Sequence, residues 1–319
     1  MGVTCREEFQ YQNLCFHETK PYKFTRSQWR ISQETYILWR LFWALWHFAW
    51  LAFSIQLNTI EERYSGEQIK WLIYLSNWSY AILTAQSCLH TGIICYIYVV
   101  KKEDMVEENI QWYLKVLWLL TTFGFDSAIL VTALYWTLVF DGAIKTFLTV
   151  ATHAINSVYV LMDIFLIAAP VRLLHIVYPI MYGLAYTLFT FMYHIYGGTN
   201  KKSEPFIYKP LDWSKLHSAL TVSLGSVFVG VPAVHLLQFG LYALRLHILE
   251  TSKCCNRCAN IDRETGKCVG GKSDPKQTKM AENDTNECAQ TLVDIEYRNK
   301  ISVTSQYVDM FDNTTATSC

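Results

Sequence analysis

Long apolar segments recur through the first 250 residues of this chain and leave few folds open to it. Each is 20 or more residues long, which is what an α-helix needs to cross the hydrocarbon core of a bilayer. Hydrophobic residues make up 52% of the chain and aromatic residues 15%, so the pattern is not that of a disordered or an average soluble protein. The sequence therefore predicts an all-α polytopic membrane protein, a bundle of six transmembrane helices.

The apolar segments divide the chain into three parts. Residues 1–35 form a polar arm without the apolar core of a signal peptide, residues 36–249 form the transmembrane domain, and residues 250–319 form a Cys-containing, mostly disordered tail. Arg40 lies near the inner end of the first span, where its long side chain is expected to snorkel to the interface. The expected spans are residues 36–55, 71–100, 112–139, 146–168, 173–195 and 219–246.

An even number of spans places both termini on the same side of the membrane. Lys and Arg near the membrane ends favour cytosolic termini, although four lysines are predicted on the outer side: Lys201, Lys202, Lys209 and Lys215. We expect the plasma membrane rather than the endoplasmic reticulum. The formal net charge is zero, which argues against nucleic acid as a partner, and the expected contacts are membrane lipids and protein partners at the cell surface. No cofactor is expected.

The fourth predicted span carries a polar seam. At about 100° per residue, His153, Asn156 and Asp163 fall within roughly 80° of one another on one helix. Polar and ionisable groups at membrane depth are expensive, so they usually face other helices or a cavity. The seam is therefore the first place to look for a functional site.

The outer half of this seam shares its depth with residues of the second span. Ser76 lies about five residues into its span and His153 about seven residues into its own, with Asn77 and Asn156 close to them. A serine with a histidine base predicts nucleophilic catalysis, in which the two asparagines stabilise an oxyanion or orient the ring. Two alternatives remain open: these groups bond neighbouring helices and hold the bundle together, or they line a permeation or lipid-binding site.

A second polar layer lies nearer the predicted cytosolic side. It contains His90, Asp163, Arg172 and His175, and a pairing of Asp163 with Arg172 or His175 would neutralise the buried carboxylate. Asp126 lies between the layers and is expected to be protonated or paired, since an unpaired charge there costs about 2.5–3.5 kcal/mol. We interpret this layer as structural.

The cysteines that follow the last span are candidates for lipidation. Cys254, Cys255 and Cys258 lie directly against the predicted membrane end, which favours S-palmitoylation. Cys255, Cys258 and Cys268 also allow a zinc site, but their spacing is poor and no second close pair follows. We therefore expect no metal.

Several of these segments together resemble one family of membrane proteins, the rolling stone proteins. The resemblance runs from about residue 24 to the end of the sixth span and rests on four motifs in order: Tyr74-Leu-Ser-Asn-Trp-Ser-Tyr80, His153-Ala-Ile-Asn-Ser157, Pro170-Val-Arg-Leu-Leu-His-Ile-Val-Tyr-Pro179 and Leu211-Asp-Trp-Ser214. It implies a multipass membrane protein with a role in cell–cell or membrane fusion, as in the fusion of myoblasts.

The chain is more distantly similar to the androgen-induced, FAR-17a-type membrane hydrolases. That similarity implies a threonine and a histidine acting on fatty acid esters of hydroxy fatty acids. His153 matches the histidine. One alignment places Ile73 at the threonine, which would abolish the chemistry, and a shift of three residues places Ser76 there, which would preserve it.

Overall fold

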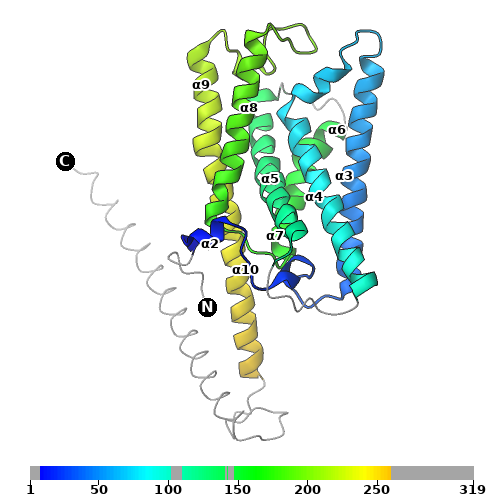
Figure 1. The fold of residues 1–319 in the computed structure, drawn as a ribbon, viewed down its shortest axis with the longest axis vertical. Helices are drawn as coiled ribbons and strands as arrows, with labels where there is room; N and C mark the ends of the chain where they lie inside the picture. Colours follow the sequence, from blue (N-terminus) through cyan, green and yellow to red (C-terminus); the bar gives the residue numbers. More distant parts are fainter. Residues whose placement is uncertain (1–7, 102–109, 141, 143–146, 260–319) are drawn as a thin grey trace, which may run out of the picture. The chain divides into compact units, whose positions relative to one another are not determined.

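The computed structural model describes residues 8–101, 110–140, 142 and 147–259, and most of these residues are helical (Figure 1). The described residues form no strand. Their β-type pairing is limited to one isolated antiparallel bridge, between Ser27 and Ile167. The all-α prediction is confirmed. The main helices are α3 (Gln33–Glu61), α4 (Leu75–Tyr96), α5 (Trp112–Leu134), α7 (Asn156–Leu166), α8 (Val177–Ile195), α9 (Leu216–Gly225) and α10 (Val231–Ala259).

Short elements extend or join these helices. α2 (Tyr11–Leu14) and the 3-10 turn η1 (Pro21–Phe24) belong to the N-terminal arm, and the 3-10 turns η2 (Gln68–Ile73), η6 (Leu173–Ile176) and η7 (Lys209–Leu211) precede α4, α8 and α9. α6 (Phe147–Val150) leads toward α7. Four segments are π-helical: η3 (Ile97–Lys101), η4 (Tyr135–Val139), η5 (Ala151–Ile155) and η8 (Ser226–Gly230).

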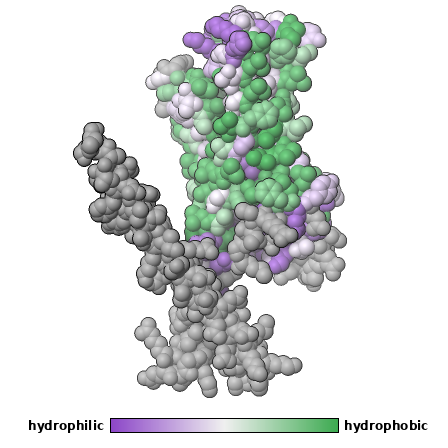
Figure 2. Space-filling model, turned by 90° about the vertical axis from the view of Figure 1, so that its left-hand side faces the viewer, coloured by the Kyte–Doolittle hydropathy of each residue, from purple (hydrophilic) through white to green (hydrophobic). Residues whose placement is uncertain are grey.

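Residues up to Arg245 form one compact unit, a bundle in which α4 packs between α3 and α5, and α5 also contacts α7 and α8 (Figure 1). Five segments within the described residues are long and apolar enough to cross a membrane: Leu75–Val100, Trp112–Val139, Phe147–Leu166, Leu173–Ile195 and Leu216–Ser252. Figure 2 shows a belt of hydrophobic side chains beneath a hydrophilic upper end. The chain is therefore a multipass membrane protein.

The sixth expected span lies on α3, which is not among those five segments. α3 is a continuous helix of 29 residues whose first turn is capped by Ser32, with the Thr35 N–H donating to the Ser32 hydroxyl. Its outward side is apolar at helical spacing, with Leu38, Leu45 and Phe48 all more than half exposed. The count of six spans stays a prediction.

The polypeptide leaves helical geometry between α7 and η6, where Ile167 and Arg172 are both extended. Buried backbone carbonyls in such a break need donors from elsewhere in the protein. Arg245, fully buried on α10, donates to the carbonyls of Ile164 and Ile167 and, at 3.1 Å, to that of Ala169. One arginine thus satisfies three carbonyls at this break.

The N-terminal arm packs against the same end of the bundle. The Gln28 N–H donates to the Leu166 carbonyl at 2.9 Å, and the Ala168 N–H donates to the Arg26 carbonyl at 3.3 Å. His90 Nε2 donates to the Phe24 carbonyl at 2.7 Å. His175 is enclosed by three aromatic rings, whose centroids lie 4.4 to 5.6 Å away: Phe16, Trp118 and Tyr178.

A buried ion pair joins α3 to α7 in the core. Arg40 Nη1 lies 2.8 Å from Asp163 Oδ2, and both side chains are almost fully buried. Trp39 Nε1 donates to the other carboxylate oxygen at 3.1 Å, and Arg40 Nη2 donates to the Tyr36 hydroxyl at 2.7 Å. Snorkelling by Arg40 was therefore the wrong expectation, because a buried carboxylate lies within its reach.

The predicted partners of Asp163 are also wrong. Arg172 donates instead to Glu8 of the N-terminal arm at 2.8 Å, and His175 lies among aromatic rings. Arg172 and His175 come after the end of α7. The change of chain direction there brings their side chains to the N-terminal arm and away from the α3–α7 interface.

We expect the core ion pair to behave as a unit. Arg40→Met leaves the Asp163 carboxylate buried without its cation, which costs about 3–5 kcal/mol of unfolding free energy, and the double change Arg40→Met with Asp163→Leu restores much of the loss. The measurement is equilibrium unfolding in detergent. The matched control is Lys215→Met, which removes the exposed cation of the Lys215–Asp212 pair and costs about 0–1 kcal/mol. Equal effects of the two single variants would contradict the prediction.

Candidate functional site

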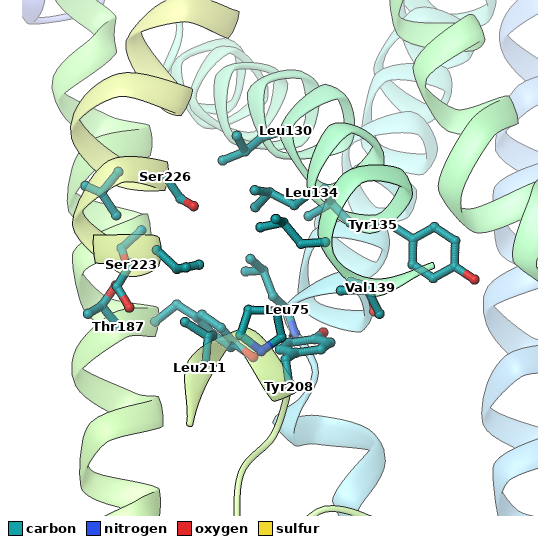
Figure 3. Close-up of a pocket in the computed structure, with 18 of the residues that line it drawn as sticks. Leu75, Leu130, Leu134, Tyr135, Val139, Thr187, Tyr208, Leu211, Ser223 and Ser226 are labelled. Carbon is teal, nitrogen blue, oxygen red and sulfur yellow. Dashed lines mark hydrogen bonds between the residues drawn. The ribbon is translucent and has the colours of Figure 1, made fainter. Parts of the chain in front are cut away.

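A partly open cavity of about 170 Å³ lies between the start of α4, the end of α5, the middle of α8 and the end of α9 (Figure 3). Its wall is mostly leucine and valine, as at Leu75, Leu130 and Leu134. An engineered apolar cavity of about 150 Å³ binds benzene, so this space suits a hydrocarbon group and not a whole lipid. The side chains with polar atoms that line it are Ser76, Tyr135, His153, Tyr186, Thr187, Tyr208, Ser223 and Ser226.

Three of the four π-helical segments in the described part of the chain contribute residues to this cavity. η4 provides Tyr135 and Val139, η5 provides His153, and η8 provides Ser226 and Val227. A π-helical turn is rare because it widens the helix and weakens its packing, and such turns occur frequently at functional sites. Their convergence on one cavity marks it as the best candidate site of the molecule.

His153 is fixed in the cavity wall by stacking. Its ring lies parallel to that of Tyr135, with an interplanar angle of 3° and a centroid distance of 3.9 Å. Trp136 Nε1 donates to the His153 carbonyl at 2.7 Å. The Nδ1 atom of the ring is buried and has no hydrogen-bond partner among the described residues. The imidazole is therefore held in place while this nitrogen stays unused.

Ser76 lies in the first turn of α4, which other elements of the bundle hold in place. The Tyr186 hydroxyl, from α8, accepts from the Leu75 N–H at 3.0 Å and donates to the Ile73 carbonyl at 2.8 Å. Tyr208, from the loop before η7, lines the cavity together with Ser76. Burial raises the pKa of Tyr208 to about 12, so its phenol is neutral at pH 7. Ser76 thus shares the cavity with a neutral phenol.

The two predicted asparagines do not line the cavity. Asn77 Nδ2 donates to the Trp71 carbonyl at 2.7 Å, and Asn156 Nδ2 donates to the Thr152 carbonyl at 2.8 Å. Asn156 Oδ1 accepts from the Thr132 hydroxyl at 3.3 Å. The structure therefore brings Ser76 and His153 to one cavity and gives Asn77 and Asn156 local hydrogen bonds, and the catalytic role of all four stays a prediction.

Asp126 has the buried partner that was expected, and it is a histidine. His235 Nδ1 lies 2.8 Å from Asp126 Oδ2, and Gln238 donates to Asp126 Oδ1 at 2.8 Å. These groups adjoin a second cavity of about 30 Å³, which is large enough for water alone. This smaller space is therefore no substrate site.

Sequence reasoning missed the roles of Tyr208 and Arg245. Tyr208 belongs to a polar loop, and its side chain reaches the cavity only because that loop folds back over the start of α4. In the sequence, Arg245 looks like an ordinary cation at the end of an apolar segment. Backbone carbonyls are available to it only because α7 ends at Leu166 and leaves them without helical partners. An arginine so close to a predicted span end was the available signal.

The lipidation candidates Cys254, Cys255 and Cys258 lie on the last turns of α10, past position 250 where the tail was expected to begin. Their side chains, and all of the tail from residue 260 with Cys268, lie outside the described residues. Palmitoylation of these cysteines stays a prediction.

Comparison with known proteins gives a consistent result over most of the chain. A family model described as "Protein rolling stone" matches residues 2–254. A relative from Drosophila melanogaster, "Protein rolling stone", is 27% identical over 252 residues, which cover 75% of this chain and 89% of the relative. No solved structure matches the chain.

Proposed function

The chain belongs to the rolling stone family, and we propose that it acts at the plasma membrane in cell–cell fusion of the myoblast type, or in a closely related membrane process. Membrane lipids and protein partners at the cell surface are its proposed contacts, with both termini in the cytosol. The observation that carries the proposal is the family match over residues 2–254.

The packing of the bundle supports this proposal. Charged groups in the core, such as Arg40 and Asp163, pair with each other inside the bundle. The outer surface therefore stays available for contacts with other molecules. That surface carries exposed apolar side chains such as Leu38 on α3, Leu188 on α8 and Val229 on η8. Apolar helix faces of this kind suit lipid chains and the helices of partner membrane proteins.

The fusion proposal predicts a gain of function in a cell-mixing assay. Two cell populations carry complementary halves of a split reporter, and both express the full chain. We expect more reconstituted reporter than in cells that express an unrelated multipass protein at the same surface level, because the proposed activity lies in the chain itself. Equal signals at equal surface levels would contradict the proposal.

The topology is tested separately. An epitope inserted between Ser65 and Gly66, in the exposed turn after α3, is expected to be labelled on intact cells. An epitope at the N-terminus is expected to need permeabilisation. Glycan on Asn283 or Asn313, the sequons of the tail, would place the C-terminus outside and overturn this topology.

A second candidate function is hydrolysis of a lipid ester, such as a fatty acid ester of a hydroxy fatty acid. The observation that favours it is that Ser76 and His153 line one apolar cavity. A hydrocarbon chain in this cavity would place an ester beside a serine hydroxyl and an imidazole, which are the nucleophile and base of acyl transfer.

The chemistry would take two steps. Ser76 Oγ attacks the ester carbonyl while His153 takes the hydroxyl proton and passes it to the leaving alcohol. Water then attacks the acyl-serine, with His153 again as base, and the acid leaves as Ser76 is regenerated. The buried, unpartnered Nδ1 supports a ring held ready for such a partner.

The hydrolase candidate predicts that purified protein turns over lipid esters and reacts with a fluorophosphonate probe. Ser76→Ala and His153→Ala are expected to lower turnover at least about 100-fold, since each removes a group that acts in both steps. Ser79→Ala is the matched control, a buried serine one turn along α4 that does not line the cavity. No turnover and no probe labelling by the wild-type protein would rule the candidate out.

A further inference from the structure

Two buried carboxylates of the N-terminal arm converge on one arginine at the break after α7. Arg172 Nη1 lies 2.8 Å from Glu8 Oε1, and Arg172 Nη2 lies 3.7 Å from Glu18 Oε2. Lys23 Nζ lies 3.2 Å from Glu18 Oε2 and so keeps the cluster close to neutral. Glu8 is 2% exposed and Glu18 5%, so these ion pairs are packed between the arm and the bundle.

The backbone of the same arginine continues the hydrogen-bonded chain into the protein. The Arg172 carbonyl accepts from His235 Nε2 at 3.0 Å, and His235 Nδ1 lies 2.8 Å from Asp126 Oδ2. A carbonyl only accepts, so Nε2 carries a proton, and the hydrogen bond between Nδ1 and the carboxylate contains one further proton. The Asp126–His235 pair is therefore neutral overall. The His235 ring is held at both of its nitrogens, by Asp126 at Nδ1 and by the Arg172 carbonyl at Nε2.

This pair lies next to the cavity that contains Ser76 and His153. Leu130, four residues after Asp126 on α5, lines the cavity, and so does Val231, four residues before His235 on α10. Residues four apart on a helix lie on the same face. A Cβ atom added to Gly230, the last residue of η8 and the neighbour of Val231, would come within 2.9 Å of Leu130 Cδ1, so α5 closely approaches the junction of η8 and α10 at this wall.

We propose that the N-terminal arm is a latch on the cavity. Docking of Glu8 and Glu18 onto Arg172 sets the position of the Arg172 carbonyl, and the carbonyl orients His235. His235 in turn holds Asp126 and closes α5 against α10 at Leu130 and Val231. Release of the arm loosens that wall and widens access to the cavity. This inference stands apart from the fusion and hydrolase proposals, since it concerns access to the cavity and not its use.

The two ends of this network differ in exposure as a latch requires. The Arg172 side chain is 20% exposed, whereas those of Asp126 and His235 are 2% exposed. Solvent and cytosolic partners can therefore compete for the Arg172 end, while the cavity end stays shielded. The arm also bonds the break itself through Ser27, whose hydroxyl donates to the Leu166 carbonyl at 3.0 Å.

The test measures access to the cavity directly. Ser226→Cys places a thiol on the cavity wall, and its rate of labelling by a membrane-permeant maleimide is read by peptide mass spectrometry on the full chain in lipid nanodiscs. Glu8→Gln with Glu18→Gln is expected to raise this rate at least about fivefold, which is the low end of ordinary coupling between sites. Glu34→Gln is the matched control, an exposed carboxylate bonded to the Tyr98 hydroxyl outside this network.

A double-mutant cycle separates a latch from general loosening. Asp126→Asn alone is expected to raise the labelling rate, and adding the two arm changes to it is expected to raise the rate no further, because the same chain of bonds is already broken. A second reporter, Ala44→Cys in the buried face of α3, is expected to stay unlabelled. Unchanged labelling in the Glu8/Glu18 variant, multiplicative effects in the cycle, or equal gains at both reporters would each overturn the proposal.

Discussion

The bundle depends on one constraint, that every buried backbone group must find a hydrogen bond. Between α7 and η6 a helical ladder no longer supplies these partners. Arg245, Trp118 and His235 then provide the donors from distant helices. The docking of the arm and the position of Arg172 follow from the same need, so this end of the bundle is organised around a break.

Polar groups in the molecule serve two different purposes. Those of the core, above all Arg40 and Asp163, form an ion pair that holds α3 against α7. Those of the cavity are only partly used, as with the free Nδ1 of His153, and they lie beside π-helical turns that pack less well than α-helix. Unused hydrogen-bonding capacity and irregular backbone coincide at the cavity. At the α3–α7 ion pair Arg40 Nε also has no partner among the described residues, but both members of the pair lie in regular α-helix.

Helical periodicity and length were enough to predict the helices, since both depend on local sequence. The helical rise per residue also predicted that Ser76 and His153 lie at a similar depth in the membrane, and the structure places both at one cavity. Periodicity does not say which faces of two helices meet, so it missed the Arg40–Asp163 pair, whose members are 123 residues apart. No sequence pattern predicted the π-helical turns or the fold of the loop that carries Tyr208, because both depend on tertiary packing.

Arg245 gives the break a property that an ion could not. In transporters with discontinuous membrane helices, unwound carbonyls coordinate a sodium ion or proton that comes and goes with its concentration. Here the carbonyls of Ile164, Ile167 and Ala169 receive a guanidinium that is covalently part of α10. This cation does not dissociate, so mass action does not govern its occupancy. The guanidinium at these three carbonyls is therefore present whatever the ionic composition on either side of the membrane.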